Sequence, residues 1–129
     1  MIFDTSFLID LMNRQEYAIK RLEQLQKMNS SNFITVIAIF ELWSGAVRSQ
    51  KPEKEKQKIL NILESLPILS LDQKSSKIAG EIHGQLLQKG MSIDPEDCMI
   101  AGIAKNYNQS ILTRDKHFQR IKNIVVETY

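Results

Sequence analysis

Four carboxylates in this sequence stand where they could share one chemical task, namely Asp4, Glu41, Asp97 and Asp115. Three of them also have an ordinary explanation taken singly. Asp4 and Asp115 can each cap a helix, and Asp97 is a usual acid for a first helical turn. Glu41 is harder to explain, because it lies within the apolar run Val36–Trp43, where an unpaired carboxylate would be costly. It therefore needs a cation or a hydrogen-bond partner.

Four carboxylates in one place predict a divalent cation. Two like charges about 4 Å apart repel by roughly 4 kcal/mol at an effective dielectric constant near 20, and bound cations offset that repulsion. Oxygen ligands favour Mg²⁺ or Mn²⁺, whereas zinc usually takes His or Cys. The sequence offers zinc only His83, His117 and Cys98, at no zinc-like spacing. We expect one or two Mg²⁺ or Mn²⁺ ions, with His117 at the surface or touching substrate and Cys98 in the core.

The elements that must position these acids alternate along the chain. Short apolar segments predict five strands, and segments with helical periodicity lie between them. The predicted strands are 2–3, 33–35, 68–71, 110–113 and 124–126. The predicted helices cover about 7–12, 17–28, 36–48, 56–66, 73–89 and 97–107, with a loop at 50–55 and a helical turn at 115–120.

Strands that alternate with helices predict an α/β fold with a parallel sheet covered on both faces. In such sheets ligands bind outside the carboxyl ends of the strands. Asp4 follows the first predicted strand, Asp115 follows the fourth, and Asp97 begins the helix before the fourth. Glu41 lies about two turns into the helix after the second strand, so it joins them only if that helix lies across the same edge.

Length and composition narrow the function classes. The chain has 129 residues, 43% hydrophobic and 25% charged, which predicts one soluble domain over residues 1–129. A net charge of +2 neither requires nor opposes a polyanionic partner. One cysteine excludes an intrachain disulfide and favours the reducing cytoplasm. We expect no secretory leader and no membrane span, and five glycines without a phosphate-cradling loop disfavour a nucleotide-dependent enzyme.

Each of the four acids lies in a recognisable segment. The segments read MIFDTSFLIDLM around Asp4, ELWSG from Glu41, DCMIAGIA from Asp97 and LTRDKHFQRI around Asp115. In this order they resemble the motifs of the PIN-domain ribonucleases, particularly the VapC toxins of prokaryotic toxin–antitoxin pairs. The likeness runs over essentially the whole chain, with Gly102 where Ala is more usual, and the fourth segment is the most specific match.

The resemblance implies a fold, an activity and a set of site residues. The fold is a three-layer α/β/α PIN-like fold with a central parallel sheet of four to five short strands. The activity is metal-dependent endoribonuclease cleavage of RNA phosphodiester bonds. The catalytic, metal-binding acids fall on Asp4, Glu41, Asp97 and Asp115, with Asp4 and Asp97 as the principal ligands. The supporting hydroxyl groups fall on Ser6 and Thr113.

Other charged residues stand close to these motifs. Asp94 precedes Asp97 by one helical turn and could join or replace it. Asp10 is predicted to lie on a helix surface, and Asp72 to cap the long helix that follows it. Basic residues crowd beside the fourth acid as either a solvated end or a set of RNA phosphate contacts: Arg114, Lys116, Arg120 and Lys122. Phosphate contacts would make binding sensitive to salt.

The resemblance also implies protein partners. VapC-like proteins form homodimers and are held inactive by a small VapB-like antitoxin, whose helical segment packs on the toxin near the acids. Phe40, Trp43 and the helices around Tyr17–Leu25 and Ile59–Leu66 could offer that surface, although most of these apolar side chains are expected in the core.

Three other functions compete with a toxin nuclease. A PIN nuclease outside toxin–antitoxin systems could serve RNA maturation. A receiver domain also groups acids at a sheet edge, but it needs an acid pair after the first strand, and Asp4 has no acidic neighbour. A non-catalytic PIN-like binding domain would tolerate loss of acids, and all four matching positions keep theirs. The sequence therefore favours the nuclease.

Overall fold

The computed structural model describes all 129 residues, and five short parallel strands form its centre. These are β1 (Ile2–Phe3), β2 (Ile34–Thr35), β3 (Ile68–Leu69), β4 (Ile111–Leu112) and β5 (Val126–Glu127). β1 pairs with β4, β4 with β5, and β2 with β3. A parallel bridge between Ile2 and Phe33 joins the two groups. The strand order is therefore β3–β2–β1–β4–β5, which confirms the predicted parallel sheet.

Six α-helices and one 3₁₀-helix connect the strands. They are α1 (Thr5–Met12), α2 (Glu16–Lys27), α3 (Val36–Val47), α4 (Pro52–Leu63), α5 (Gln73–Gln88), α6 (Pro95–Asn106) and η1 (Lys116–Arg120). None of these helices has the length and apolar character needed to cross a membrane.

The predicted boundaries of two elements, the fourth helix and the last strand, were wrong. α4 begins at Pro52 rather than after a loop over 50–55, because proline is well suited to a first helical position and Glu53 and Glu55 lie favourably at the positive end of the helix dipole. α4 also ends at Leu63, so Leu66 lies beyond it. The last strand lies at 126–127 instead of 124–126, where its register with β4 places it.

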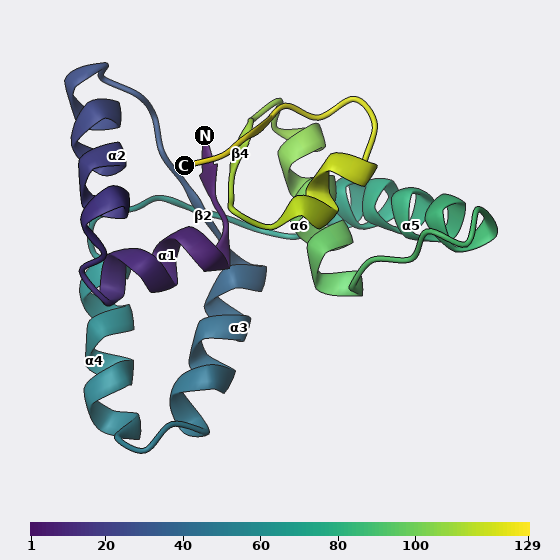
Figure 1. Cartoon of the computed structure of the whole chain (residues 1–129). Helices are drawn as coiled ribbons and strands as arrows, with labels where there is room; N and C mark the ends of the chain where they lie inside the picture. Colours follow the sequence, from purple (N-terminus) through teal and green to yellow (C-terminus); the bar gives the residue numbers. More distant parts are fainter.

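The sheet separates two hydrophobic cores, with α1–α4 on one side and α5 and α6 on the other (Figure 1). Neighbouring residues of a strand point to opposite faces. Accordingly, Ile2 and Ile111 pack toward α5 and α6, whereas Phe3 and Leu112 pack toward α1–α4. This arrangement confirms the three-layer α/β/α architecture.

Gly102 allows α6 to lie unusually close to α5. A Cβ atom at this position would lie 2.6 Å from the Ser75 backbone oxygen and 2.9 Å from the Ala79 Cβ. Asn106 adds a hydrogen bond of 3.0 Å from Nδ2 to Ser75 Oγ, and Asp72 caps α5 through Ser75 N at 2.7 Å, as predicted. The helix that carries Asp97 is thus held tightly against its neighbour.

Candidate active site

Asp4 lies at the carboxyl end of β1 and is 5% exposed. Its Oδ2 accepts hydrogen bonds from Thr113 Oγ1 at 2.7 Å and from Ser6 Oγ at 3.0 Å. The two hydroxyl groups lie 3.2 Å apart. One carboxylate oxygen is therefore held by a residue that follows β4 and by a residue in the first turn of α1. The predicted supporting residues, Ser6 and Thr113, therefore do contact Asp4, and both fix the orientation of its carboxylate.

Asp97 lies in the first turn of α6 and is 9% exposed. Burial raises the pKa of its carboxyl group to about 7, and the negative charges of Asp4, Asp115 and Glu41 add to this effect. These acids come from four separate places in the chain, yet each is close enough to disfavour ionisation of Asp97. The structure thus places the four predicted acids near one another, and brings Asp97 and Asp115 within the distance at which two ligands share one cation.

Asp115 follows β4 and begins η1. Its Oδ1 accepts a hydrogen bond from the His117 backbone N at 2.9 Å and lies 2.9 Å from His117 Nδ1. The Asp115 backbone N in turn donates to Thr113 Oγ1 at 2.9 Å. His117 is exposed, as predicted, but it also holds the Asp115 carboxylate in place, a contact that sequence reasoning missed.

Glu41 reaches the same site from α3, because that helix crosses the sheet edge. Thr5 Oγ1 donates a hydrogen bond of 2.8 Å to Glu41 Oε1, which supplies the partner that its apolar surroundings require. Burial raises the pKa of Glu41, and Asp4 contributes to this shift. α3 therefore lies across the sheet edge, which is the condition for Glu41 to join the other acids.

The site fits a divalent cation. Single ligand atoms of Asp97, Asp115 and His117 all lie within 4.8 Å of one another, and Asp4 and Glu41 add negative charge to the same place. Carboxylates that repel one another are stabilised when a cation replaces the missing counter-charge. Cys98 is 1% exposed and its pKa is raised to about 11 by burial and by Asp97, so it packs as a neutral core residue, as predicted.

Asp94 and Asp97 occupy different environments. Asp94 is the exposed residue that precedes α6, and its side chain makes no capping hydrogen bond. It influences Asp97 only as the weakest of the acids that raise its pKa. The geometry therefore favours Asp97 over Asp94 as the acid of this site.

The sequence matches known proteins over nearly its full length. The model of the PIN-domain family matches residues 1–124. The chain belongs to the PIN-domain family. It is 29% identical over 129 residues to ribonuclease VapC2 of Rickettsia felis, covering 99% of this chain and 96% of that relative. It is 30% identical over 131 residues to ribonuclease VapC1 of Methanocaldococcus jannaschii, covering 100% of this chain and 86% of that relative.

Solved structures agree with the sequence relatives. The VapBC2 complex of Rickettsia felis bound to a DNA fragment from its promoter has a TM-score of 0.90 at 31% identity, covering 100% of this chain and 99% of that chain. The DNA-bound VapBC complex of Salmonella typhimurium has a TM-score of 0.87 at 27% identity, covering 98% of this chain and 96% of that chain. This PIN domain is of the VapC type.

A second polar cluster, beside the acids, was missed from the sequence. Asp10 was predicted on a helix surface, but it is 4% exposed. Tyr129 Oη donates a hydrogen bond of 2.6 Å to Asp10 Oδ2, and Arg114 Nε lies 3.5 Å from the same oxygen. The Tyr129 ring packs against Phe7 and stacks on Tyr17. The only signal in the sequence was an acid with apolar neighbours in α1, and its partners are more than a hundred residues away.

Tyr129→Phe is expected to lower the free energy of unfolding of this PIN domain by about 1–2 kcal/mol, because the buried Asp10 carboxylate loses a short hydrogen bond. Urea unfolding measures the change. Tyr17→Phe is the matched control, since its ring stacks on Tyr129 but its hydroxyl group makes no hydrogen bond. Equal stabilities of the two variants would contradict a structural role for the Asp10–Tyr129 contact.

Proposed function

We propose that this VapC-type PIN domain is a divalent-metal-dependent endoribonuclease that cuts RNA phosphodiester bonds as the toxin of a VapBC-type pair. One observation carries the nuclease assignment: burial raises the pKa of Asp97 to about 7, and the negative charges of Asp4, Asp115 and Glu41, which come from other parts of the chain, repel its carboxylate as well. Such repulsion is costly for a merely structural site and is typical of sites that bind a catalytic cation. The names of the relatives, ribonucleases and VapBC complexes, support the same conclusion.

Asp4 and Asp97 are the principal ligands in this proposal, and Asp115 and Glu41 complete the set directly or through water. Bound Mg²⁺ or Mn²⁺, as one or two ions, would supply an activated water and neutralise phosphate charge. Ser6 and Thr113 both donate to Oδ2 of Asp4, which leaves Oδ1 available for a ligand. Burial raises the pKa of Glu41, which makes it a stronger base and a candidate to accept a proton from the attacking water.

Arg114, Lys116 and Arg120 remain our candidates for RNA phosphate contacts at the mouth of the site. Arg114 is 55% exposed in its side chain, and its ion pair with Asp10 fixes it close to Ser6 and Thr113. Lys116 and Arg120 lie at the two ends of η1 and are exposed. Both positive charges therefore lie on η1, the short helix that directly follows Asp115.

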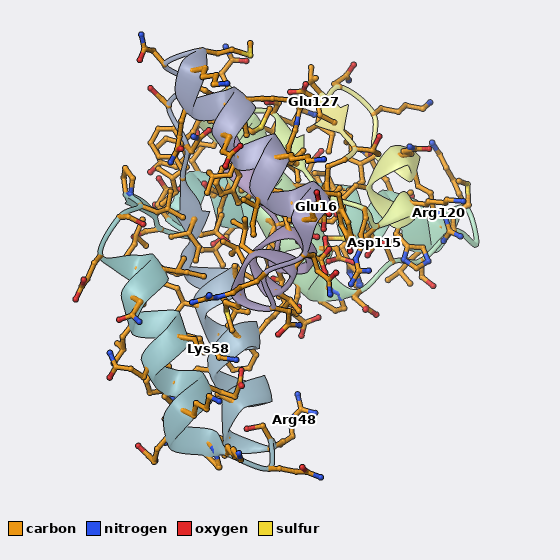
Figure 2. All side chains as sticks on the ribbon, turned by 60° about the vertical axis from the view of Figure 1, so that its left-hand side comes forward. Glu16, Arg48, Lys58, Asp115, Arg120 and Glu127 are labelled. Atoms are coloured by element: carbon orange, nitrogen blue, oxygen red, sulfur yellow. The ribbon has the colours of Figure 1, made fainter.

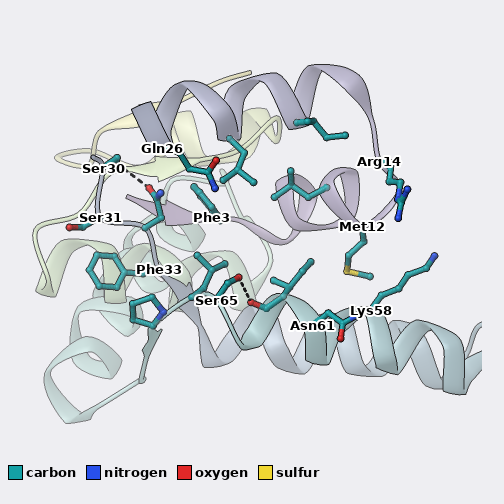
Figure 3. A pocket seen from close by; sticks show the side chains of 17 residues that line it. Phe3, Met12, Arg14, Gln26, Ser30, Ser31, Phe33, Lys58, Asn61 and Ser65 are labelled. Atoms are coloured by element: carbon teal, nitrogen blue, oxygen red, sulfur yellow. Dashed lines mark hydrogen bonds between the residues drawn. The ribbon is translucent and has the colours of Figure 1, made fainter. Parts of the chain in front are cut away.

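The antitoxin is proposed to occupy a groove between α2 and α4. This groove has a volume of about 740 Å³, and its apolar lining includes Leu11, Ile19, Leu22, Ile62 and Leu66. Arg14 and Lys58 stand at one end of it and Ser30 and Ser31 at the other (Figure 3). The predicted surfaces on α2 and α4 thus form one groove. Phe40 and Trp43 lie outside it, on α3.

Cleavage by the purified protein tests the nuclease assignment. Total RNA incubated with protein and Mn²⁺ or Mg²⁺ is expected to be cut at defined positions, and EDTA is expected to stop the reaction. Mapping of new RNA ends after expression, with Asp4→Asn as the control, identifies the target. Absence of metal-dependent ends in the wild-type sample would refute the nuclease.

Partner experiments separate a toxin from an RNA-maturation nuclease. A toxin is expected to co-purify with a small protein encoded beside it and to arrest growth when expressed without that protein. A maturation nuclease would do neither. The homodimer also stays a prediction, and a solution mass of one chain at micromolar concentration would contradict it. We expect the protein to act in the cytoplasm, where its single cysteine stays reduced.

A further inference from the structure

A second concave site, which we call the basic pocket, lies between the ends of α5 and α6 and the segment that follows η1. It has a volume of about 340 Å³. Four cationic side chains from three parts of the chain line it, and no acidic residue does: Lys89, Lys105, Arg120 and Lys122. Buried or nearly buried apolar side chains, including Leu86 and Ile121 at 7% exposure each, form part of its wall.

The four cations of the basic pocket have no carboxylate partners. All ion pairs in the structure use other cations, namely Lys20, Arg21, Lys56, Lys58, Arg114 and His117. Arg120 Nη1 donates to the Ser92 backbone oxygen at 3.1 Å, which holds its guanidinium group at the pocket. Unpaired like charges around one hollow repel one another, and an anion bound among them would relieve that repulsion. The basic pocket therefore has the charge of an anion site.

The basic pocket is connected to the acidic site by η1. Asp115 precedes this helix and Arg120 ends it. At about 2.0 Å per residue, a 3₁₀-helix places these two residues roughly 10 Å apart along its axis. Figure 2 shows Asp115 and Arg120 at the two ends of this short segment. An RNA strand with one phosphate at the acids could therefore place another phosphate, a small number of nucleotides away, in the basic pocket.

We propose that the basic pocket binds a backbone phosphate of the RNA strand beyond the cleaved bond, with the sugar or base against its apolar wall. The inference rests on the proposed nuclease function, because it takes the ligand to be the RNA substrate. The volume of the basic pocket fits a nucleotide better than a protein helix. The pocket also lies at the far end of η1, the helix that Asp115 precedes. An acidic protein partner is the competing occupant.

Binding of a labelled single-stranded oligoribonucleotide of mixed sequence tests the basic pocket. We compare a pocket variant, Lys89→Gln with Lys105→Gln and Lys122→Gln, with the wild type by fluorescence anisotropy in EDTA, which prevents cleavage. Loss of one phosphate contact should reduce the slope of log affinity against log salt by about 0.7, and weaken binding about fivefold at 0.1 M salt. The control variant, Lys27→Gln with Lys51→Gln and Lys54→Gln, makes the same charge change at exposed lysines outside the pocket.

The outcomes separate this inference from the proposed function. Weaker binding and a smaller salt slope in the pocket variant than in the control variant support the pocket, even if the wild type cuts no RNA. Equal affinities of the two variants overturn the pocket, even if the wild type cuts RNA as proposed. A pocket variant that binds RNA normally but loses a co-purifying acidic protein also overturns the RNA assignment. Urea unfolding of both variants checks that the fold is intact.

Discussion

Asp97→Asn is expected to reduce RNA cleavage about a thousandfold or more while making the metal-free protein more stable at pH 8. The loss has the scale found when a group that acts on transition-state charge is removed. The gain follows because asparagine keeps the shape of the side chain but carries no charge, so the cost of burying a charge and the repulsion from Asp4, Asp115 and Glu41 both disappear. Opposite changes in activity and stability mark a residue retained for function rather than for folding.

Asp4→Asn should lose activity to a similar degree, and Asp94→Asn is the matched control for both. Asp94 is exposed, directly precedes α6 three residues before Asp97, and makes no side-chain capping hydrogen bond. Its replacement should leave most of the cleavage rate. Single-turnover cleavage of a labelled RNA measures all three variants. A normal rate in Asp97→Asn together with a large loss in Asp94→Asn would transfer the metal-site role to Asp94.

The metal-free protein is expected to lose stability as the pH rises from about 4 to about 7. In the unfolded chain the Asp97 carboxyl group ionises near its ordinary value of 3.8, whereas in the folded protein its pKa is about 7. Between these values the folded state binds the extra proton, so unfolding releases it and a rising pH favours the unfolded state. Above about pH 7 the group is ionised in both states and the penalty is complete. The raised pKa of Glu41 acts in the same direction.

Urea unfolding in EDTA across this pH range, for the wild type and for Asp97→Asn, isolates the contribution of Asp97. The difference in stability between the two proteins should be smallest near pH 4 and grow toward pH 7. A difference that stays constant across the range would contradict the raised pKa of Asp97.

Divalent cations should restore the stability that the metal-free protein loses when the Asp97 carboxyl group ionises. At pH 8, Mn²⁺ or Mg²⁺ at a hundred times its dissociation constant should stabilise the wild type by about 2.7 kcal/mol, which corresponds to roughly 10 °C in Tm for a chain of this size. The effect should be weaker at pH 5, because protons compete with the cation for Asp97. Sodium chloride at matched ionic strength is the control. Equal thermal shifts in the wild type and in Asp97→Asn would place the cation elsewhere.

The sequence by itself determined the alternation of strands and helices and the four acids. Both depend on short-range features, namely apolar periodicity and side chains placed directly after strands or in the first turn of a helix. Parallel strands bring their carboxyl ends to one edge of the sheet. Asp4 and Asp115 follow strands, and Asp97 begins the helix that leads back to the start of the next strand, so all three lie at this edge once the sheet forms. Ser6 and Thr113 follow for the same reason, since each is within two residues of an acid at that edge.

Only the tertiary structure decided how distant positions meet. The rotation of α1 turns Asp10 inward toward Tyr129, a partner 119 residues away, so a residue predicted on a helix surface is buried. The approach of α5 to α6 at Gly102 and the crossing of α3 that delivers Glu41 depend on packing between helices. The basic pocket likewise joins lysines from three elements. Such contacts depend on the relative placement of whole elements, which local sequence patterns do not encode.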